Sequence, residues 1–294
     1  NNGVNLAASV PTSGTINIAN FRSQAKGFRF TFTSGATNQN ASSLFGDDYA
    51  VNYPKEIVID SGVELGATST SEEALQIDTG ASGTITVTNN GTLSGAGGAA
   101  GSAGGDAFEA DIACTLINNG TIRAGGGGGG TGGGGQYSSS SSSTSYSNPP
   151  PGFGGATYWA DTWYGSFDHV TWGGTYYNST SSGNQSFSKG SYQEYNSTSN
   201  IYLYQVTRTV TTTTNTNGGA GGVGQGYNQS AGSGVGGGTN AGTGGSGASF
   251  GSAGSTGANG NRTNGVAGGA AGNYIRGVSF VTLTQSGTVQ GGTA

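Results

Sequence analysis

The chain has 294 residues, of which 62 are glycine, 32% are apolar and only 8% are charged. Its formal net charge of −5 is too small to keep a chain unfolded by self-repulsion, and its nine Lys and Arg residues form no basic patch for nucleic acid. So few aliphatic side chains exclude one large aliphatic core, and the backbone must hydrogen-bond in some other way.

Residues 1–94 are predicted to form a β-rich connecting domain. Apolar and polar residues alternate in GTINIANF, FRFTFTSG, EIVIDSGVEL and GTITVTNNGTL, and turn residues separate these runs. Helix signals are weak, and the best of them, SEEALQI at residues 71–77, is no longer than one turn or a loop. We therefore expect a mainly β protein with almost no α-helix.

Residues 95–135 and 218–294 are predicted to hold glycine rods, the second region ending in a closing β-strand. Glycine recurs at every third residue in Gly95–Gly104, Gly126–Gly135 and Gly251–Gly260. A period of three belongs to extended helices of the polyproline-II type, whose free backbone groups can bond between neighbouring rods when glycine allows close approach. We expect a bundle of polyglycine-II helices, and the alternative is a flexible Gly/Ser linker.

Short matching segments precede the glycine runs. TNNGTLSG begins at Thr88, INNGTIRA at Ile117 and TQSGTVQG at Thr284, and DSGVELGA at Asp60 is a looser relative. Each combines a strand, an Asn-Gly or Ser-Gly turn and a second short strand. We interpret them as β-hairpin anchors that launch the rods, with the turn glycine supplying a positive φ.

Residues 136–217 are predicted to be an aromatic-rich insertion, because they hold all three tryptophans and ten of the fourteen tyrosines among many Ser, Asn and Gly residues. Antibody loops use this composition, and Trp and Tyr are enriched at binding hot spots. With few Leu or Ile, the insertion must also bury some rings; the tryptophans suit that core and the tyrosines suit the surface. The candidate binding residues are Tyr158, Trp159, Trp163, Tyr164, Trp172, Tyr176, Tyr177, Tyr192 and Tyr195.

Catalytic and metal chemistry find little support in the sequence. The single histidine, His169, has Asp168 as its direct neighbour, which is a poor position for the orienting carboxylate of a triad. His169 and Cys114 are too few ligands for zinc. Asp161, Asp168 and Glu194 suit polar contacts, although a paired-carboxylate glycan hydrolase is an alternative. We predict no enzyme activity, no metal and no cofactor, and no apolar stretch is long enough for a membrane span.

Several motifs in order resemble the glycine-rich receptor-binding tip of tailed-phage fibres. They are GATSTSEEAL, GGDAFEA, INNGTI before a glycine run, and GNYIRGVSFVTLTQSGT. Similar modules close the host-specificity (central tail fibre) protein of some siphophages, and the distal adhesin of T-even-like tail fibres is related. The resemblance covers most of residues 55–135 and 218–294. It implies a polyglycine-II bundle, variable aromatic loops and adhesion to a bacterial surface, although one long insertion stands here where T-even-like adhesins have several shorter loops.

The expected function is therefore that of a tail-fibre tip adhesin, extracellular on the virion, that binds an outer-membrane protein or surface glycan and so sets host specificity. Its other expected partners are tail-fibre or tail-tip proteins joined through the N-terminal domain, and three chains could form the tip. Neither nucleic acid binding nor membrane insertion is expected. The alternatives are a secreted bacterial β-solenoid adhesin or surface filament, in which coils of strands would replace the rods, and then an ice-binding protein or a glycan depolymerase.

Overall fold

The computed structural model describes the backbone of residues 27–147, 156–158, 170–172, 175–177, 179–182, 185–196 and 201–294, and side chains of residues 27–143 and 207–294. Two compact units are present. The first combines Asn1–Gly135 with Thr216–Ala294, and the second is Gln136–Asn215.

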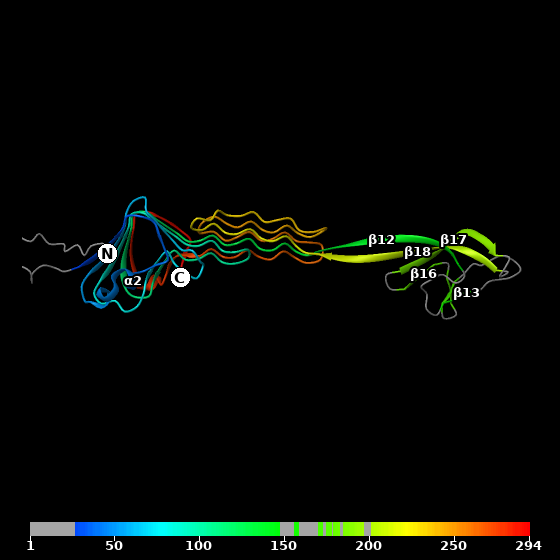
Figure 1. Cartoon of the computed structure of the whole chain (residues 1–294), viewed down its shortest axis with the longest axis horizontal. Helices are drawn as coiled ribbons and strands as arrows, with labels where there is room; N and C mark the ends of the chain where they lie inside the picture. Colours follow the sequence, from blue (N-terminus) through cyan, green and yellow to red (C-terminus); the bar gives the residue numbers. More distant parts are fainter. Residues whose placement is uncertain are drawn as a thin grey trace, which may run out of the picture. The chain divides into compact units, whose positions relative to one another are not determined.

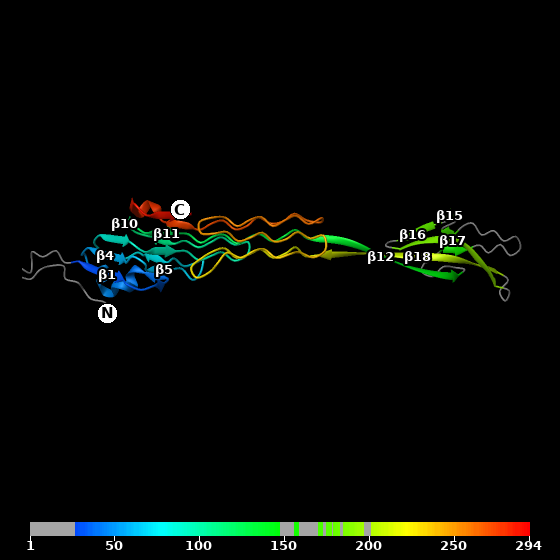
Figure 2. The same cartoon turned by 90° about the horizontal axis from the view of Figure 1, so that it is seen from above.

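The base of the first unit is a coil of parallel strands with three sides (Figures 1 and 2). Successive strands of the chain join the first, second and third sheet in turn. Three such strands, one in each sheet, make one circuit of the coil, and each circuit stacks on the one before. The first sheet contains β1 (Phe28–Phe32), β4 (Lys55–Ile59), β7 (Ile85–Asn89), β10 (Cys114–Asn118) and β20 (Val281–Gln285). The second contains β2 (Ala36–Thr37), β5 (Glu64–Gly66), β8 (Thr92–Ser94), β11 (Thr121–Arg123) and β21 (Thr288–Gln290). The third contains β3 (Gln39–Asn40), β6 (Leu75–Ile77), β9 (Phe108–Ala110), β19 (Asn273–Arg276) and β22 (Gly292–Thr293).

Alternation along the strands gives the coil its core. In the first sheet, Ile57, Val87 and Leu116 lie in register and are fully buried. Matching rows of apolar side chains line the other two sheets, and each fully buried side chain contributes about 1.5–3 kcal/mol. These rows are Leu65, Leu93 and Ile122 in the second sheet and Leu75, Phe108 and Ile275 in the third. The β alternation read from FRFTFTSG, EIVIDSGVEL and GTITVTNNGTL therefore marks real strands, stacked into a coil, whereas GTINIANF lies outside the described residues.

The turn motifs are corners of this coil, and the expectation of β-hairpin anchors is wrong. β7 pairs with β4 and β10, whereas β8 lies in the second sheet, so the two strands on either side of a turn never pair with each other. At the corner, buried Asn89 donates through Nδ2 to Oδ1 of buried Asn118 at 2.8 Å. Asn118 in turn donates to Gln285 Oε1 at 3.3 Å. This ladder satisfies the polar groups inside the corner.

Of the four turn glycines, Gly62 in the looser relative DSGVELGA has the predicted positive φ, at +81°, whereas the other three are needed for a different reason. Gly91, Gly120 and Gly287 have no positive φ. A Cβ at Gly120 would instead lie 2.1 Å from the carbonyl oxygen of Gly91, and one at Gly287 would lie 2.0 Å from that of Gly120. The glycines therefore allow successive corners to stack in contact.

Helix is confined to the connection between the first two circuits in the described part of the coil, apart from a short 3₁₀ turn at Val278–Phe280. α2 (Ala41–Phe45) begins after Asn40, whose side chain caps the Ser42 amide, and η1 (Gly46–Ala50) follows. The SEEALQI segment contains no helix, because Leu75–Ile77 forms β6. Little helix was expected, and little is found.

Lys55 is a charged side chain inside the coil, only 1% exposed. Its Nζ donates to the carbonyl oxygens of Val51 at 2.7 Å, Tyr53 at 3.2 Å and Ser82 at 2.6 Å. Burial lowers its pKa below the ordinary lysine value. The ammonium group thereby joins the connections that lead into β4 and β7.

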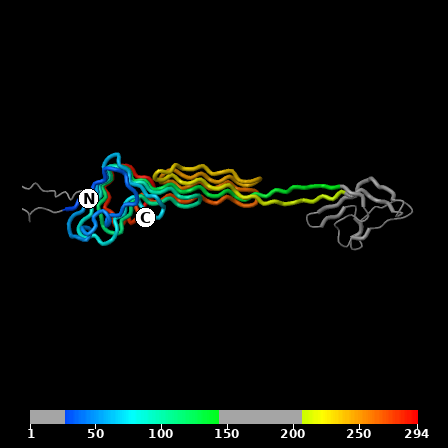
Figure 3. The backbone as a smooth tube through the Cα atoms, in the orientation of Figure 1, coloured from blue at the N-terminus to red at the C-terminus, as the bar shows by residue number. Residues whose placement is uncertain are grey.

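The glycine segments leave the coil at one corner, between the second and third sheets. Residues 95–107 form the excursion between β8 and β9, and residues 124–272 that between β11 and β19. Despite these excursions, β9 and β19 return in register, with Phe108 beside Ile275. In Figure 3 the segments within the first unit appear as wavy, extended traces lying side by side.

Backbone hydrogen bonds between different glycine segments hold these traces together. Across residues 95–107, 124–134 and 217–272, the only assigned β feature is an isolated bridge between Gly226 and Gln229. The coiled strands of the β-solenoid alternative are thus present at the base but do not extend through the glycine segments.

Residues 124–134 lie at the centre of this arrangement. Their amides donate, for example, from Gly128 to Ser102 O at 2.9 Å, from Gly129 to Gly222 O at 2.8 Å and from Gly130 to Ser255 O at 2.9 Å. Their carbonyls accept from still other segments. These acceptor bonds are Gly98 N to Gly126 O, Ala248 N to Gly127 O and Gly269 N to Gly128 O. Because neighbours surround this stretch, nearly every residue in it is glycine.

Thr131 is the one non-glycine between Gly125 and Gly135, and its position has a physical reason. A Cβ at Gly125 or Gly128 would lie within 1.8 Å of the carbonyl oxygens of Ala96 and Ala99 respectively. Thr131 follows Gly128 by three residues and has no such neighbour, because the segment that contains Ala96 and Ala99 turns back at Gly101, which has a φ of +75°. Thr131 is consequently exposed.

Two turns of the glycine segments pack on the second sheet of the coil. The Phe250 ring, 8% exposed, lies 3.9 Å from the guanidinium carbon of Arg123. Arg123 is held by Glu64 at 2.8 Å and Ser94 at 2.7 Å. The Tyr227 ring lies over Gly66, where a Cβ would come within 2.0 Å of the ring.

The second unit contains antiparallel strands. β12 (Gly135–Ser147), β18 (Ile201–Thr216), β17 (Gln185–Asn196) and β16 (Ser179–Ser182) form a four-stranded sheet. A smaller sheet contains β13 (Ala156–Tyr158), β14 (Val170–Trp172) and β15 (Thr175–Tyr177).

Candidate receptor-contact site

The backbone of the second unit places six of the nine predicted aromatic residues on strands. Tyr158 ends β13, Trp172 ends β14, Tyr176 and Tyr177 end β15, and Tyr192 and Tyr195 belong to β17. Trp159, Trp163 and Tyr164 lie outside the described residues. The predicted site is therefore distributed over two sheets in its described part.

Strand register brings some of these residues together. In the small sheet, Tyr158 is opposite Val170, and Val170 is opposite Tyr177, so two tyrosines share one row across the three strands. In the large sheet, Tyr195 is opposite Tyr202, a tyrosine that sequence reasoning did not select. The β17–β18 register shifts between Lys189 and Gln193, and Tyr192 falls within this irregularity.

A ladder of neutral polar side chains joins β12 to β18. Gln136 Nε2 donates to Asn215 Oδ1 at 3.1 Å. Three hydroxyl pairs continue the series, Ser138–Thr213 at 3.3 Å, Ser140–Thr211 at 2.9 Å and Ser142–Thr209 at 2.8 Å. Such cross-strand pairs each contribute about 0.2–1 kcal/mol. The serine run and TVTTTTNT therefore form two partner strands, a pairing that neither segment reveals alone.

Reactive groups are sparse where side chains are described. No group of three or more His, Cys, Asp or Glu residues that could hold a metal ion occurs among the described residues. Cys114 is buried in the coil, and burial raises the pKa of its thiol to about 11, which keeps the thiol protonated and unreactive. His169, Asp161 and Asp168 lie outside the described residues. In the part of the chain that is described, no helix is both long enough and apolar enough to cross a membrane.

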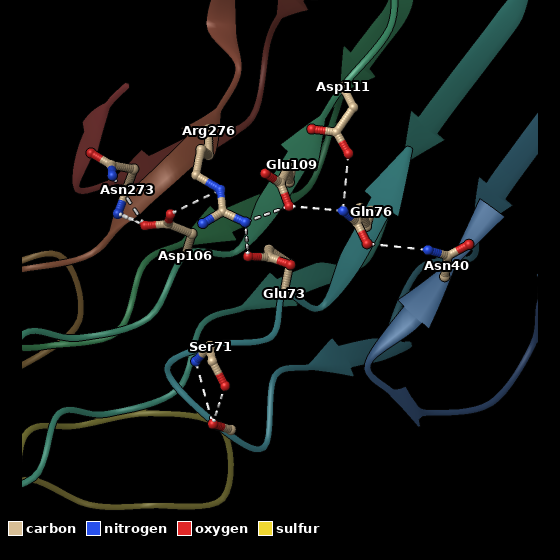
Figure 4. A network of polar contacts seen from close by, with 10 residues as sticks. Asn40, Ser71, Glu73, Gln76, Asp106, Glu109, Asp111, Asn273 and Arg276 are labelled. Atoms are coloured by element: carbon tan, nitrogen blue, oxygen red, sulfur yellow. Dashed lines mark hydrogen bonds and ion pairs between the residues drawn. The ribbon is translucent and has the colours of Figure 1, made fainter. Parts of the chain in front are cut away.

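The most closely spaced ionisable side chains with described positions lie on the third sheet of the coil. Arg276 on β19 contacts Glu73, Asp106 and Glu109 (Figure 4). Glu73 lies just before β6, so these groups come from three successive circuits. Sequence reasoning missed this cluster, because its members are up to 203 positions apart in the chain.

Comparison with known proteins gives one result. The family model described as phage tail fibre adhesin Gp38 matches residues 27–294, which cover the coil, the glycine segments and the aromatic unit. No curated protein and no solved structure matches the chain. The matched family is one of adhesins and not of enzymes. The chain thus belongs to the Gp38 family of phage tail fibre adhesins, extracellular proteins of the virion that act in attachment to the host.

Proposed function

We propose that the second unit, with its aromatic strands, makes the contact with the bacterial receptor, and that the glycine segments support it as a polyglycine-II bundle. The coil would join the adhesin to the rest of the tail fibre. The observation that carries the proposal is the concentration of tryptophan and tyrosine in one compact unit inserted into the glycine region.

Composition supports a receptor contact by aromatic side chains. Asp161, Asp168, Lys189, Glu194 and Arg208 are the only Asp, Glu, Lys or Arg residues of the 136–217 segment. Recognition by a strongly charged surface is therefore disfavoured. Rigid rings among small polar residues give a large contact area at low cost in conformational entropy, and a few such rings usually dominate the affinity. An outer-membrane protein or a surface glycan would suit this chemistry.

Two observations support the polyglycine-II assignment. Glycines recur every third residue, as a helix with three residues per turn requires. Amides also repeat their bonding at this spacing, since Gly126, Gly129 and Gly132 donate to Gln225, Gly222 and Gly219. An extended helix of this type has no internal hydrogen bonds, so bonds between segments would supply its stability.

Attachment to the fibre is assigned to the coil because its last circuit is open in the described structure. β20, β21 and β22 each pair on one side only, as do β1, β2 and β3 at the opposite end of the coil. Val281, Leu283 and Val289 of this circuit are only partly buried against the core, and Phe280 beside them is 45% exposed. Unpaired strand edges with apolar side chains are suited to docking another β structure, such as the end of a fibre.

Deletion of residues 136–217 tests the receptor assignment. A short Gly/Ser linker would join Gly135 to Gly218, and binding of the purified adhesin to host cells would be measured. We expect loss of binding while the coil and glycine segments stay folded. Undiminished binding by the folded deletion variant would refute the assignment.

Point variants sharpen this experiment. Tyr158→Ala and Tyr177→Ala, in the shared row of the small sheet, are each expected to weaken binding at least tenfold. Val235→Ser and Val266→Ser, both 56% exposed on the glycine segments, serve as controls that should bind normally. Treating host cells with protease or with periodate then distinguishes a protein receptor from a glycan.

A further inference from the structure

A cluster of carboxylates surrounds one guanidinium where the glycine segments rejoin the coil (Figure 4). We call this set of Glu73, Asp106, Glu109 and Arg276 the joint cluster. Arg276 Nη2 donates both to Glu73 Oε1, at 2.6 Å, and to Glu109 Oε2, at 2.5 Å. Its Nε lies 3.7 Å from Asp106 Oδ2. Sharing one nitrogen places the Glu73 and Glu109 carboxyl groups next to each other.

The joint cluster fastens three successive circuits. Asp106 follows the returning glycine segment of the third circuit, and its Oδ1 accepts from the backbone amide of Asn273 at 2.5 Å and from its side chain at 3.1 Å. Asn273 begins β19 directly after the last glycine segment. Backbone hydrogen bonds join the same circuits, since the Ala74 amide donates to Ala107 O and the Ala107 amide donates to Asn273 O. Loosening the joint cluster would therefore loosen the place where glycine segments meet the coil.

The charges in this cluster do not balance. Three carboxylates face one guanidinium, and a fourth carboxylate, Asp111, shares the donor Gln76 Nε2 with Glu109. Gln76 in turn accepts from Asn40, so the β3 side of the sheet contributes a neutral group. Glu73 is only 7% exposed, whereas Arg276 is 44% exposed on its side chain. An ionised Glu73 would thus be a poorly solvated second charge beside Glu109.

Protonation of Glu73 relieves this imbalance. Burial, together with the neighbouring Glu109 and Asp106 charges, raises the pKa of Glu73 to about 7 against the opposing effect of Arg276. When protonated, Glu73 can still accept from Arg276 through its carbonyl oxygen and can donate its own hydrogen to Glu109.

We propose that the joint cluster is a pH-sensitive contact between the coil and the glycine segments. While this contact is formed, Glu73 is protonated and lies against Glu109 and Arg276. Ionisation of Glu73 weakens the contact. This proposal does not depend on which part of the adhesin binds the receptor. It concerns the connection between the coil and the glycine segments.

The sign of the pH effect follows from linkage. A carboxyl group whose pKa is raised by folding stabilises the folded state fully below its unfolded value of about 4.5. That stabilisation is lost as the pH rises from about 4.5 to about 7, where the folded chain also gives up the proton. Stability from this group should therefore decrease toward neutral and alkaline pH.

Thermal unfolding of the full chain between pH 4.5 and pH 8.5 tests this expectation with Glu73→Gln, an uncharged side chain of similar shape. The control is Glu72→Gln, at the exposed neighbouring position on the same loop. We expect the midpoint of the wild type to fall relative to that of Glu73→Gln as the pH rises, while Glu72→Gln follows the wild type. Parallel curves for wild type and Glu73→Gln would overturn the proposal.

A direct titration decides the question even if Glu73→Gln fails to fold. The full wild-type chain would be labelled with ¹³C at the glutamate carboxyl carbons, and the chemical shift of each would be followed with pH. We expect one glutamate to titrate near pH 7 and to disappear from the spectrum of Glu73→Gln or, failing that, of Glu73→Asp. A titration of Glu73 near pH 4.5 would overturn the proposal.

Discussion

Replacing Gly129 by alanine should strongly destabilise the glycine segments. Gly129 lies in the central stretch, where its amide donates to Gly222 O at 2.8 Å and its carbonyl accepts from Gly101 N at 2.8 Å. A Cβ at this position would lie only 2.0 Å from the carbonyl oxygen of Gly245. Ordinary contact begins at 3.4 Å, so the two segments would have to separate by more than an ångström.

The cost follows from the hydrogen bonds that such a separation breaks. The affected bonds include those from Gly245 to Gly130 and from Gly129 to Gly222, each made by a buried or nearly buried backbone. A buried backbone group left without a partner costs about 1–3 kcal/mol. We therefore expect Gly129→Ala to lower the free energy of unfolding by about 2–5 kcal/mol, within the range of severe core substitutions.

Gly236→Ala is the matched control, since a Cβ at Gly236 meets no atom within 4 Å and its φ is not positive. That substitution should be neutral or stabilise by up to about 1 kcal/mol, through the reduced freedom of the unfolded chain. Denaturant unfolding and resistance to protease would be measured for both variants. Equal stability of Gly129→Ala and Gly236→Ala would refute the close-packing argument.

Two further substitutions test the coil and its contact with the glycine segments. Lys55→Met should lower the free energy of unfolding by about 2–4 kcal/mol, because three carbonyl oxygens lose their donor. A denaturation midpoint equal to that of the wild type would contradict a stabilising role of the Lys55 ammonium group. Phe250→Ala should cost about 3 kcal/mol by removing a buried ring over Arg123, whereas Phe280→Ala, at a 45% exposed position, should cost less than about 1 kcal/mol. A similar loss in both phenylalanine variants would argue against a specific contact by Phe250.

The sequence showed which segments are periodic more reliably than it showed which segments pair with each other. Period-two segments such as FRFTF and ITVT became strands, since alternation is a property of each strand alone. The period of three at Gly95 and Gly126 likewise marked segments that bond side by side. What periodicity could not show is which segments become neighbours. The central position of residues 124–134 depends on contacts with residues 217–272, far along the chain.

The incorrect prediction of β-hairpin anchors has the same cause, since a local pattern does not show which strands pair. A strand, Asn-Gly and a second strand is the local pattern of a two-residue hairpin, and it is equally the pattern of a corner in a coil. Only the pairing partner distinguishes them, and the partner of β7 is β10 rather than β8. One signal could have helped, because both corners share the residues NNGT in the same order, as stacking of Asn89 on Asn118 requires.

For function, the sequence indicated which part of the chain is the candidate for binding more clearly than it indicated which side chains bind. Tyr and Trp composition selected a unit of the chain, but the alternation of strands β13–β15 does not say which rings meet a receptor. The joint cluster was invisible for a geometric reason, since Glu73 and Arg276 become neighbours only after the long excursion of residues 124–272 has closed.

The corner at which that excursion leaves the coil explains how a large unit can be inserted without disturbing the base. On the coil side, β11 and β19 keep their register with β8 and β9, whatever lies between them. Within the glycine segments, Gly132 donates to Gly219 O at 2.8 Å, which holds the outgoing and returning stretches side by side. The two stretches of the first unit that flank residues 136–215 are therefore held together by bonds that involve none of those residues. Under the proposed function, substitutions within residues 136–215 should change what the adhesin binds with little effect on the stability of the coil and glycine segments, which binding to host cells and thermal unfolding would measure.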